Sequence, residues 1–328
     1  MTQNQTDPLL SCADLSINFK THEGEFSAVR HVNFEIGQGQ IVGLVGESGC
    51  GKSLTALSIM GLLPETARAH GSAIQFEGKD LLKLNEHLYQ QIRGNRISMI
   101  FQEPMTSLNP VFKVGFQVRE ALLLHQNINK TEARTQAISM LKDVGIPAPE
   151  QSYNAYPHEL SGGMRQRVMI AMAMCCDPKL LIADEPTTAL DVTIQAQIIE
   201  LIKGLVRTRN MSVLFITHDL GVVAEICDRV IVMYAGGILE AGSVENILEH
   251  PLHPYTQGLL KAIPQIDKPL DYLNIIPGSV PDLKELKNMA GCCFEPRCSK
   301  AMDICKQTTP LVYTPRDNHC VNCHLYNR

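Results

Sequence analysis

The sequence has no long apolar run and no long run of basic residues. A membrane-spanning helix needs roughly 20 consecutive apolar residues, so we expect none in this chain. The first eight residues are polar and lack the charged-then-apolar pattern of a signal peptide, which favours a protein that stays in the cytosol. The net charge is −5, whereas binding to a nucleic-acid backbone needs a basic surface. We therefore expect no nucleic-acid partner.

The composition is that of a globular protein with a sizeable core. Of 328 residues, 45% are apolar and 19% are charged, which excludes collagen-like and intrinsically disordered chains. The length suits one large domain, or a domain of about 250 residues with an appendage. Prolines interrupt the regular pattern after residue 250, and a cluster of cysteines follows them. We expect a first domain over residues 1–250 and an extension over residues 251–328.

Apolar periodicity predicts an α/β fold with a mainly parallel sheet. Strands are expected at residues 9–19, 28–36, 41–45, 97–101, 180–183 and 212–216. Helices are expected at residues 52–63, 115–145, 162–176 and 193–209. The stretch 115–145 divides near Asn127, and its second helix, expected to start near Thr131, lacks the glutamate of a capping box. Because helices and strands alternate, the strands should be parallel, and the helix-rich stretch 103–178 is expected as an inserted subdomain.

Residues 46–53, Gly-Glu-Ser-Gly-Cys-Gly-Lys-Ser, match the phosphate-loop pattern between a predicted strand and a predicted helix. Glycines let consecutive backbone N–H groups point at phosphate oxygens, and the helix N-terminus adds positive potential. We expect Lys52 to reach the β- and γ-phosphates and the Ser53 hydroxyl to bind Mg²⁺. The loop residues expected around the nucleotide are Gly46, Ser48, Gly49, Cys50, Gly51, Lys52 and Ser53.

Asp184 and Glu185 directly follow the apolar run at residues 180–183. Consecutive residues at the end of a strand point to opposite sides, so the two carboxylates can act separately. Beside a phosphate loop, Asp184 is expected in the Mg²⁺ shell. Glu185 is expected to orient or deprotonate the water that attacks the γ-phosphorus. The alternative, two solvated acids at a strand end, is disfavoured by the phosphate loop.

Ser161, Gly162 and Gly163 stand at the start of the predicted helix 162–176. Serine is a good N-cap, and two glycines expose backbone N–H groups, so this is a second candidate anion site. Two such helix termini far apart in one chain favour a dimer in which each nucleotide is shared. A plain capped helix is the alternative.

With these motifs in this order, residues 9–249 resemble the nucleotide-binding subunit of ATP-binding cassette (ABC) transporters. The other residues that match are Phe19, where the family stacks an aromatic ring on adenine, Gln102 of the Q-loop, Ala189, Leu190 and Asp191 of the D-loop, and His218, the switch histidine. The resemblance implies a P-loop NTPase core with a mainly parallel sheet, an antiparallel β-subdomain, an inserted helical subdomain and a Cys-rich C-terminal extension.

The resemblance also implies a mechanism in which two ATPase subunits sandwich two ATP molecules head to tail. Lys52 and Ser53 of one subunit would face residues 161–163 of the other. The residues implied in catalysis are Glu185, His218, Gln102 and Lys52, and those implied around Mg²⁺ are Ser53, Gln102 and Asp184. Closing and reopening of the sandwich would move the membrane domains of the transporter.

Residues 103–110, 184–197, 234–237 and 253–256 are similar to the peptide and nickel importer branch of this family. The branch implies a peripheral subunit on the cytoplasmic face of the bacterial inner membrane that powers uptake of dipeptides or oligopeptides. Its partners would be a related second ATPase, two transmembrane permeases docking near residues 102–118, and an extracytoplasmic peptide-binding protein. Nickel, opines or antimicrobial peptides are alternative substrates, and a soluble ABC ATPase acting on nucleic acid is a further alternative.

Six of the eleven cysteines lie between Cys292 and Cys323. In a reducing compartment such a cluster favours a metal site over disulfides. The tail resembles that of the same importer branch, some members of which carry a 4Fe–4S cluster, and this likeness selects Cys292, Cys298, Cys305 and Cys323 as ligands. Four thiolates suffice for such a cluster. Tetrahedral Zn²⁺ and reduced structural thiols are the alternatives, and a redox regulator of transport is a further interpretation of the tail.

Overall fold

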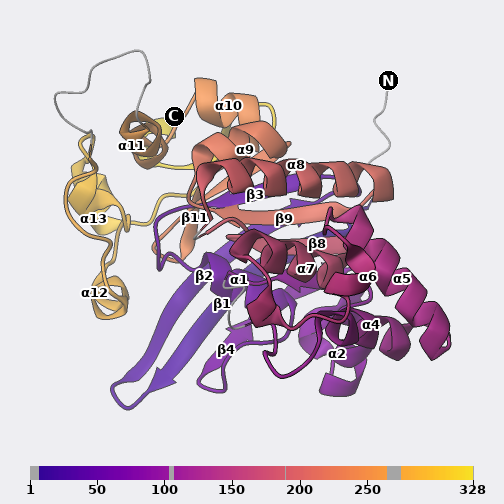
Figure 1. The fold of residues 1–328 in the computed structure, drawn as a ribbon. Helices are drawn as coiled ribbons and strands as arrows, with labels where there is room; N and C mark the ends of the chain where they lie inside the picture. The colour runs from indigo at the N-terminus through magenta and orange to yellow at the C-terminus, as the bar shows by residue number, and fades with distance from the viewer. Residues whose placement is uncertain (1–6, 103–106, 189, 264–274, 328) are drawn as a thin grey trace, which may run out of the picture. The chain divides into compact units, whose positions relative to one another are not determined.

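The chain divides into two units, each assembled from several separate segments. Figure 1 labels most of the helices and strands along the ribbon. The computed structural model describes residues 7–102, 107–188, 190–263 and 275–327. Unit 1 contains the described residues of Met1–Leu9, Ile36–Ile41 and Lys83–Ile216, and unit 2 contains those of Leu10–Glu35, Val42–Leu82 and Thr217–Arg328. Neither unit is therefore one continuous stretch of sequence.

Parallel strands form the centre of unit 1. They are β7 (Ile97–Ile100), β8 (Leu180–Asp184) and β9 (Ser212–Thr217). β7 pairs with β8 in parallel, and β8 pairs in parallel with β9. Every residue of these strands is buried, which explains why each reads as a continuous apolar run. The predicted parallel sheet is confirmed here.

Helices make up most of the rest of unit 1. They are α2 (Glu86–Ile92), α4 (Val114–His125), α5 (Lys130–Asp143), α6 (Pro149–Ser152), α7 (Gly162–Met174) and α8 (Val192–Arg209). The helices predicted at residues 115–145, 162–176 and 193–209 are confirmed, with small shifts at their ends.

α5 begins at Lys130, one residue before the expected start near Thr131, and its N-cap Asn129 forms a complete capping box. The Asn129 side chain accepts hydrogen bonds from the N–H groups of Thr131 (2.9 Å) and Glu132 (3.0 Å). The Glu132 carboxylate in turn accepts one from the Asn129 N–H at 3.0 Å. Asparagine is as good an N-cap as serine, so the capping box that is missing at Thr131 is present two residues upstream, at Asn129.

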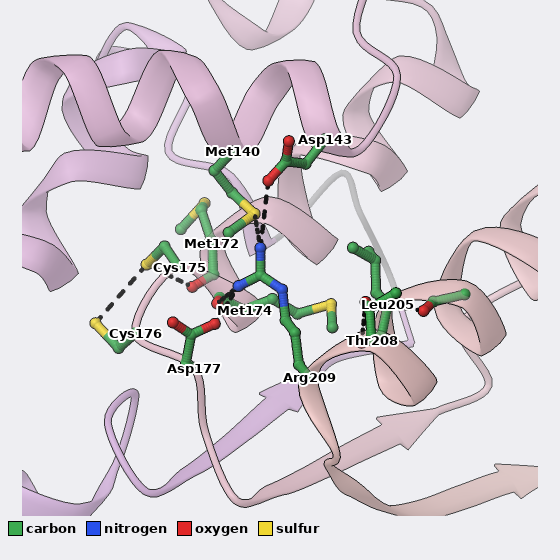
Figure 2. Close-up of polar contacts among 11 residues, drawn as sticks. Met140, Asp143, Met172, Met174, Cys175, Cys176, Asp177, Leu205, Thr208 and Arg209 are labelled. Atoms are coloured by element: carbon green, nitrogen blue, oxygen red, sulfur yellow. Dashed lines mark hydrogen bonds and ion pairs between the residues drawn. The ribbon is translucent and has the colours of Figure 1, made fainter.

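Arg209, the last residue of α8, joins the ends of α5 and α7 (Figure 2). Its guanidinium forms ion pairs with Asp143 at 3.3 Å and with Asp177, and it donates to the Met174 carbonyl oxygen at 3.3 Å. A cation in the last turn of a helix also interacts favourably with the helix dipole. This one side chain therefore connects three helices of unit 1.

Unit 2 contains an antiparallel sheet in the order β2–β1–β5–β6, with β4 also paired to β1. The strands are β1 (Leu10–Thr21), β2 (Gly24–Ile36), β4 (Ala67–His70), β5 (Ala73–Phe76) and β6 (Lys79–Asp80). The antiparallel β-subdomain that the resemblance implied is thus present.

A second group of strands in unit 2 positions the phosphate loop. β3 (Ile41–Val45) runs parallel to β10 (Arg229–Tyr234). β11 (Gly237–Ser243) pairs antiparallel with β10, β13 (His319–Asn322) pairs with β11, and β12 (Val312–Arg316) pairs with β13. The C-terminal strands therefore extend the pairing that begins at β3.

The helices of unit 2 are short. They are α1 (Lys52–Ile59), α9 (Leu220–Ile226), α10 (Val244–Glu249), α11 (Pro254–Ala262), α12 (Leu283–Asn288) and α13 (Asp303–Gln307). Within the described residues, no helix has both the length and the apolar character needed to cross a membrane.

The prediction that α1 would continue to residue 63 was wrong. Gly61 adopts a φ of 61°, and the Leu62 N–H donates to the Leu57 carbonyl oxygen at 2.8 Å. A left-handed glycine followed by a hydrogen bond that spans five residues is a common motif at helix ends. The glycine therefore ends the helix before Pro64 can.

The segments after α10 pack into the same core as β10. The rings of Tyr234 in β10, Tyr255 in α11 and Phe294 lie with centroids 4.8, 5.3 and 5.4 Å apart. All three side chains are buried. Tilted and edge-on aromatic pairs of this kind are stabilising beyond the area that they bury.

A buried carboxylate fixes both ends of the extension to β11. Glu240 accepts hydrogen bonds from the N–H groups of Leu252 (2.7 Å) and His253 (2.9 Å), and it contacts His319 Nε2 at 2.7 Å. The side chains of Glu240 and His319 are fully buried. A buried charge is tolerated only when it is paired and hydrogen-bonded, so the segments at residues 252–253 and 319 are held together.

We predict an acid-sensitive component of stability from His253, whose Nδ1 accepts the Tyr255 N–H at the start of α11. Burial lowers the pKa of His253 to about 3, whereas an unfolded histidine titrates near 6.5. Between these values the unfolded chain binds the extra proton, so stability falls as the pH falls below about 6.5, by about 1.4 kcal/mol per pH unit.

Urea unfolding at pH 7.5 and pH 5.5 measures this effect. His253→Asn retains an acceptor at the helix start and should lose less stability on acidification than the wild type, by about 1.4 kcal/mol. His22→Asn, which changes an exposed histidine, should behave like the wild type. An equal loss in wild type and His253→Asn would contradict the assignment.

Candidate nucleotide-binding site

The phosphate loop lies between β3 and α1, as the sequence predicts. Gly46 has a φ of 156°, and a Cβ atom on it would lie 2.1 Å from the carbonyl oxygen of Met233 in β10. No side chain is possible at that distance. Gly49 and Gly51 have φ values of 79° and 103°, a region that favours glycine. A close contact with β10 therefore requires glycine at position 46, and the left-handed backbone favours glycine at positions 49 and 51.

Lys52, the first residue of α1, turns its ammonium group back over the loop. Its Nζ donates to the carbonyl oxygens of Gly46 (2.8 Å) and Glu47 (3.0 Å), and the residue is only 5% exposed. A buried ammonium group needs such partners because it has lost its hydration. The lysine charge is thus held beside the loop backbone.

The remaining loop residues form an open side and a closed side. Ser48 and Gly49 are exposed, and no atom lies within 4 Å of the position of a Gly49 Cβ. Cys50 is fully buried, and burial raises the pKa of its thiol although the Lys52 charge acts against it. Ser53 is half-buried in the first turn of α1. The open side leaves the loop backbone accessible, while Cys50 fills the interior.

Phe19 and His218, the other predicted nucleotide residues of unit 2, lie on separate elements. Phe19 is half-buried on β1, opposite Ala67 of β4. His218 is exposed and directly follows β9. Their expected roles, adenine stacking and charge stabilisation, stay predictions.

The structure brings two predicted catalytic residues of unit 1 together. Gln102 Nε2 donates to Glu185 Oε2 at 3.2 Å, and the Thr188 hydroxyl donates to the same oxygen at 2.9 Å. Glu185 has a φ of 46°, which is uncommon outside glycine, and its N–H bonds the Ile216 carbonyl oxygen at 2.9 Å. The Glu185 carboxylate is therefore fixed. Asp184, the last residue of β8, is 4% exposed.

Ser161 is the N-cap of α7, as predicted, and its hydroxyl accepts the Met164 N–H at 3.3 Å. Gly162 is exposed, and no atom lies within 4 Å of the position of a Cβ on it. A Cβ on Gly163 would lie 3.0 Å from Ile194 Cγ2 of α8. The start of α7 thus presents glycine backbone to the outside, as an anion site requires.

Asp191 is the N-cap of α8, and its carboxylate accepts the Ile194 N–H at 2.9 Å. Capping α8 is a local role of Asp191, and its role at the nucleotide stays a prediction. Ala189 of the predicted D-loop, and residues 103–106 of the segment similar to importers, lie outside the described residues.

Four residues that support the site were not predicted. In unit 1 these are Thr188 and the buried Gln166, whose Nε2 donates to the Pro186 carbonyl oxygen. The sequence could have indicated them only by position, since Thr188 lies three residues after Glu185 and Gln166 lies in the first turns of α7. In unit 2 they are Tyr255 and Arg297, which contact Glu47 across 208 and 250 residues of sequence. Tyr255 lies within residues 253–256, which resemble the importer branch, but no local pattern indicates the contact of Tyr255 or Arg297 with Glu47.

The predicted cysteine ligands are free thiols in the extension. Burial is the main cause that raises the pKa of Cys292 to about 12, and the charges of Cys293, Cys305 and Cys323 add to it. These thiols are thus close enough to affect one another. Across residues 7–102, 107–188, 190–263 and 275–327, however, no three His, Cys, Asp or Glu side chains are grouped to hold a metal ion. The donors suit a thiolate-bound metal, but their arrangement does not fit one.

A parallel strand that leads through a glycine loop into a helix N-terminus defines the class of P-loop nucleotide-binding proteins. Two family descriptions match the chain: "ABC transporter" over residues 29–188, and "Oligopeptide/dipeptide transporter, C-terminal region" over residues 239–305. The chain belongs to the ATP-binding proteins of ABC transporters that carry this C-terminal region.

Similar proteins support this family over the whole length. The oligopeptide transport ATP-binding protein AppD of Bacillus subtilis is 53% identical over 319 residues, which cover 97% of each chain. OppD of Escherichia coli is 51% identical, covering 96% of this chain and 93% of its own. The dipeptide transport ATP-binding protein DppD of Escherichia coli is 48% identical, covering 96% of both.

Solved structures confirm the predicted P-loop fold. The dimeric post-hydrolysis state of the ATP-binding cassette MJ0796 with ADP and Pi has a TM-score of 0.65 and 27% identity, covering 72% of this chain and 98% of that one. The structure of cbiO1 from Clostridium perfringens, part of the transporter complex cbiONQ, has a TM-score of 0.64 and 26% identity, with coverages of 75% and 92%.

We predict that Gly46→Ala weakens MgATP binding by at least about tenfold, because its methyl group would collide with the Met233 carbonyl and push the loop from β10. Equilibrium binding of a fluorescent ATP analogue measures this. The matched control is Gly204→Ala in α8, where no atom lies within 4 Å. It should leave binding unchanged and stabilise the helix by about 0.5–1 kcal/mol. Wild-type affinity in Gly46→Ala would show that β10 does not constrain the loop.

Proposed function

We propose that this chain is the ATP-hydrolysing subunit of an ABC importer for oligopeptides or dipeptides. The likeness to oligopeptide transport ATP-binding proteins carries the proposal, since it extends over nearly the whole chain and includes the C-terminal region. Hydrolysis by such a subunit drives the conformational cycle of the transporter. The boundary near residue 250 is proposed as the division between the ATPase cassette and the importer-type extension.

In this proposal the phosphates of ATP bind to the loop at residues 46–53. Lys52 contributes its charge to the β- and γ-phosphates from the end of α1, and Phe19 stacks on the adenine. Ser53, Gln102 and Asp184 hold Mg²⁺, an ion that prefers oxygen ligands and neutralises phosphate charge. The half-buried Ser53 hydroxyl and the buried Asp184 carboxylate are oxygen donors of the right kind.

Glu185 is proposed as the general base. Its Oε2 is already held by Gln102 and Thr188, and a positioned carboxylate can orient and deprotonate an attacking water. His218 is proposed to stabilise the charge that develops on the γ-phosphate.

A dimer is proposed as the active form, with a related second ATPase subunit as the partner. The exposed start of α7, capped by Ser161 and followed by Gly162 and Gly163, is the surface that would meet the partner's nucleotide. Asp191 is proposed to contribute at the same interface. The dimeric state of the MJ0796 cassette supports this arrangement by analogy.

Two permease subunits and an extracytoplasmic peptide-binding protein are the other proposed partners, which would place the chain on the cytoplasmic face of the bacterial inner membrane. An exposed apolar surface supports a permease contact near residues 102–118. Val111, Phe112 and Phe116 are 70%, 44% and 37% exposed, and the two phenylalanine rings stack 5.0 Å apart. Apolar patches of this kind often mark protein contacts.

A 4Fe–4S cluster on Cys292, Cys298, Cys305 and Cys323 is proposed for the extension, with Zn²⁺ as the alternative metal. Burial and then the Cys305 charge raise the pKa of Cys298, and burial followed by the Cys298 and Cys305 charges raises that of Cys323. This mutual influence supports the closeness of the thiols, whereas the choice of these four rests on the resemblance of the tail to the importer branch, since the Cys293 charge also raises the pKa of Cys292. Since they are not grouped to hold a metal as they stand, binding requires them to move together.

Reconstitution with the permeases in vesicles tests the import function. A peptide-loaded binding protein should stimulate ATP turnover and peptide uptake. Glu185→Gln should reduce turnover by about 100-fold or more while ATP still binds, because the amide cannot accept the water proton. Glu200→Gln, which removes an exposed acid paired to Lys203 at 3.2 Å on α8, is the matched control and should hydrolyse normally.

Near-normal hydrolysis in Glu185→Gln would remove Glu185 from the role of base. Stimulation by binding proteins loaded with nickel, an opine or an antimicrobial peptide, and not with peptide nutrients, would change the substrate and keep the ATPase role. A preference for nucleic acid as the stimulant would contradict the importer proposal.

Anaerobic purification followed by metal and sulfide analysis tests the cysteine proposal. We expect about four iron and four sulfide per chain and a brown colour, as four thiolates bind such a cluster. Cys305→Ser should lose the iron, whereas Cys12→Ser, at a buried cysteine of β1, should retain it. Stoichiometric zinc would favour the alternative metal, and a colourless, metal-free protein would end both.

A further inference from the structure

Glu47, the second residue of the phosphate loop, is held at each of its polar groups. Its N–H donates to the Tyr255 hydroxyl at 3.0 Å, and its carbonyl oxygen accepts from Lys52 Nζ at 3.0 Å. Its two carboxylate oxygens contact Arg297 Nη1 at 3.0 and 3.1 Å. Two of these three anchors come from the C-terminal extension, far from the loop in sequence.

Arg297 is fixed independently of Glu47. Its Nε donates to the Pro277 carbonyl oxygen at 3.0 Å, and its Nη2 donates to that of Ile276 at 3.3 Å. Its Nη1 also reaches the Tyr234 hydroxyl at 3.4 Å, with the guanidinium carbon 5.6 Å from the centre of the Tyr234 ring. The Arg297 side chain is only 6% exposed. Such a rigid fork loses little freedom when it binds a carboxylate.

The charge of Glu47 needs this partner. A carboxylate inside a phosphate-binding loop repels an incoming triphosphate, and an opposite charge at hydrogen-bond distance cancels most of that field. Arg297 supplies the opposite charge and also keeps the Glu47 side chain turned toward the extension. The loop backbone is thereby available to anions although it carries an acidic residue.

We propose that Arg297 is a positioning residue for nucleotide binding, which neutralises Glu47 and holds it toward the extension so that the phosphate loop can bind MgATP. The inference rests on the proposed nucleotide site. It assigns the extension a part in ATP affinity, since Arg297 lies between Cys292 and Cys298, and Phe294 of the same segment packs on Tyr234 and Tyr255.

Equilibrium binding of MgATP to the full chain tests the proposal, with thermal melting to confirm folding. Arg297→Gln should raise the Kd about tenfold, the scale of one partly buried charge pair. The double variant Arg297→Gln/Glu47→Gln should recover most of the lost affinity, because it removes the unpaired carboxylate. A merely structural role for Arg297 would not give this recovery. Lys284→Gln, which breaks the ion pair of Lys284 with Glu23 elsewhere in unit 2, is the control and should bind like the wild type.

A wild-type Kd for Arg297→Gln, or a double variant as weak as Arg297→Gln alone, would overturn the proposal. If Arg297→Gln does not fold, Arg297→Lys decides, because lysine keeps the charge but cannot make the forked contacts. It should raise the Kd about threefold, and an unchanged Kd would count against the inference. Failure of the wild-type chain to bind MgATP would instead refute the proposed nucleotide site itself.

Discussion

An ammonium group held over backbone carbonyls is the interaction on which the nucleotide site depends. Lys52 has lost nearly all contact with water, so its charge must be satisfied by the Gly46 and Glu47 carbonyl oxygens. The same stretch of loop passes so close to the Met233 carbonyl that no Cβ fits at Gly46. The lysine and the loop backbone therefore stabilise each other's conformation, and the site has its shape before a ligand arrives.

Within unit 1, the Glu185 carboxylate is likewise held in position before any ligand binds. Glu185 has an unusual backbone conformation directly after a fully buried strand, and two side chains already bond one of its carboxylate oxygens. Residues held in sparsely populated conformations are often found at functional sites. Unit 2 thus contains the phosphate loop, and unit 1 contains the Asp184 and Glu185 carboxylates.

Much of the fold and of the candidate site could be predicted from the sequence, because the patterns that indicate them are local. The apolar runs of β3, β8 and β9, the glycine spacing of the loop and the Ser161 cap depend on residues a few positions apart, and the structure has them where expected. Helix ends were less well predicted, because α1 ends at a single left-handed glycine, Gly61, and α5 begins at a cap read two residues late.

The contacts that join the extension to the loop could not be predicted in this way. Arg297 meets Glu47 only because strand pairing and an aromatic cluster bring a distant segment beside β10. Likewise, the resemblance to the importer branch selected four cysteine ligands, but whether thiols group around a metal depends on tertiary packing, and the described residues show no such group. The likeness to peptide transport proteins shows the family of the chain. It does not reveal these contacts, which only the structure shows.

The most direct measurement is the equilibrium dissociation constant of MgATP for the full chain, compared between the wild type and Lys52→Met. Methionine retains much of the lysine's apolar length and removes its charge. The account predicts tight binding by the wild type and a loss of at least about 100-fold, or about 2.7 kcal/mol, in the variant. Equal affinity in two folded proteins would contradict the claim that a lysine-bearing phosphate loop is the nucleotide site of this chain.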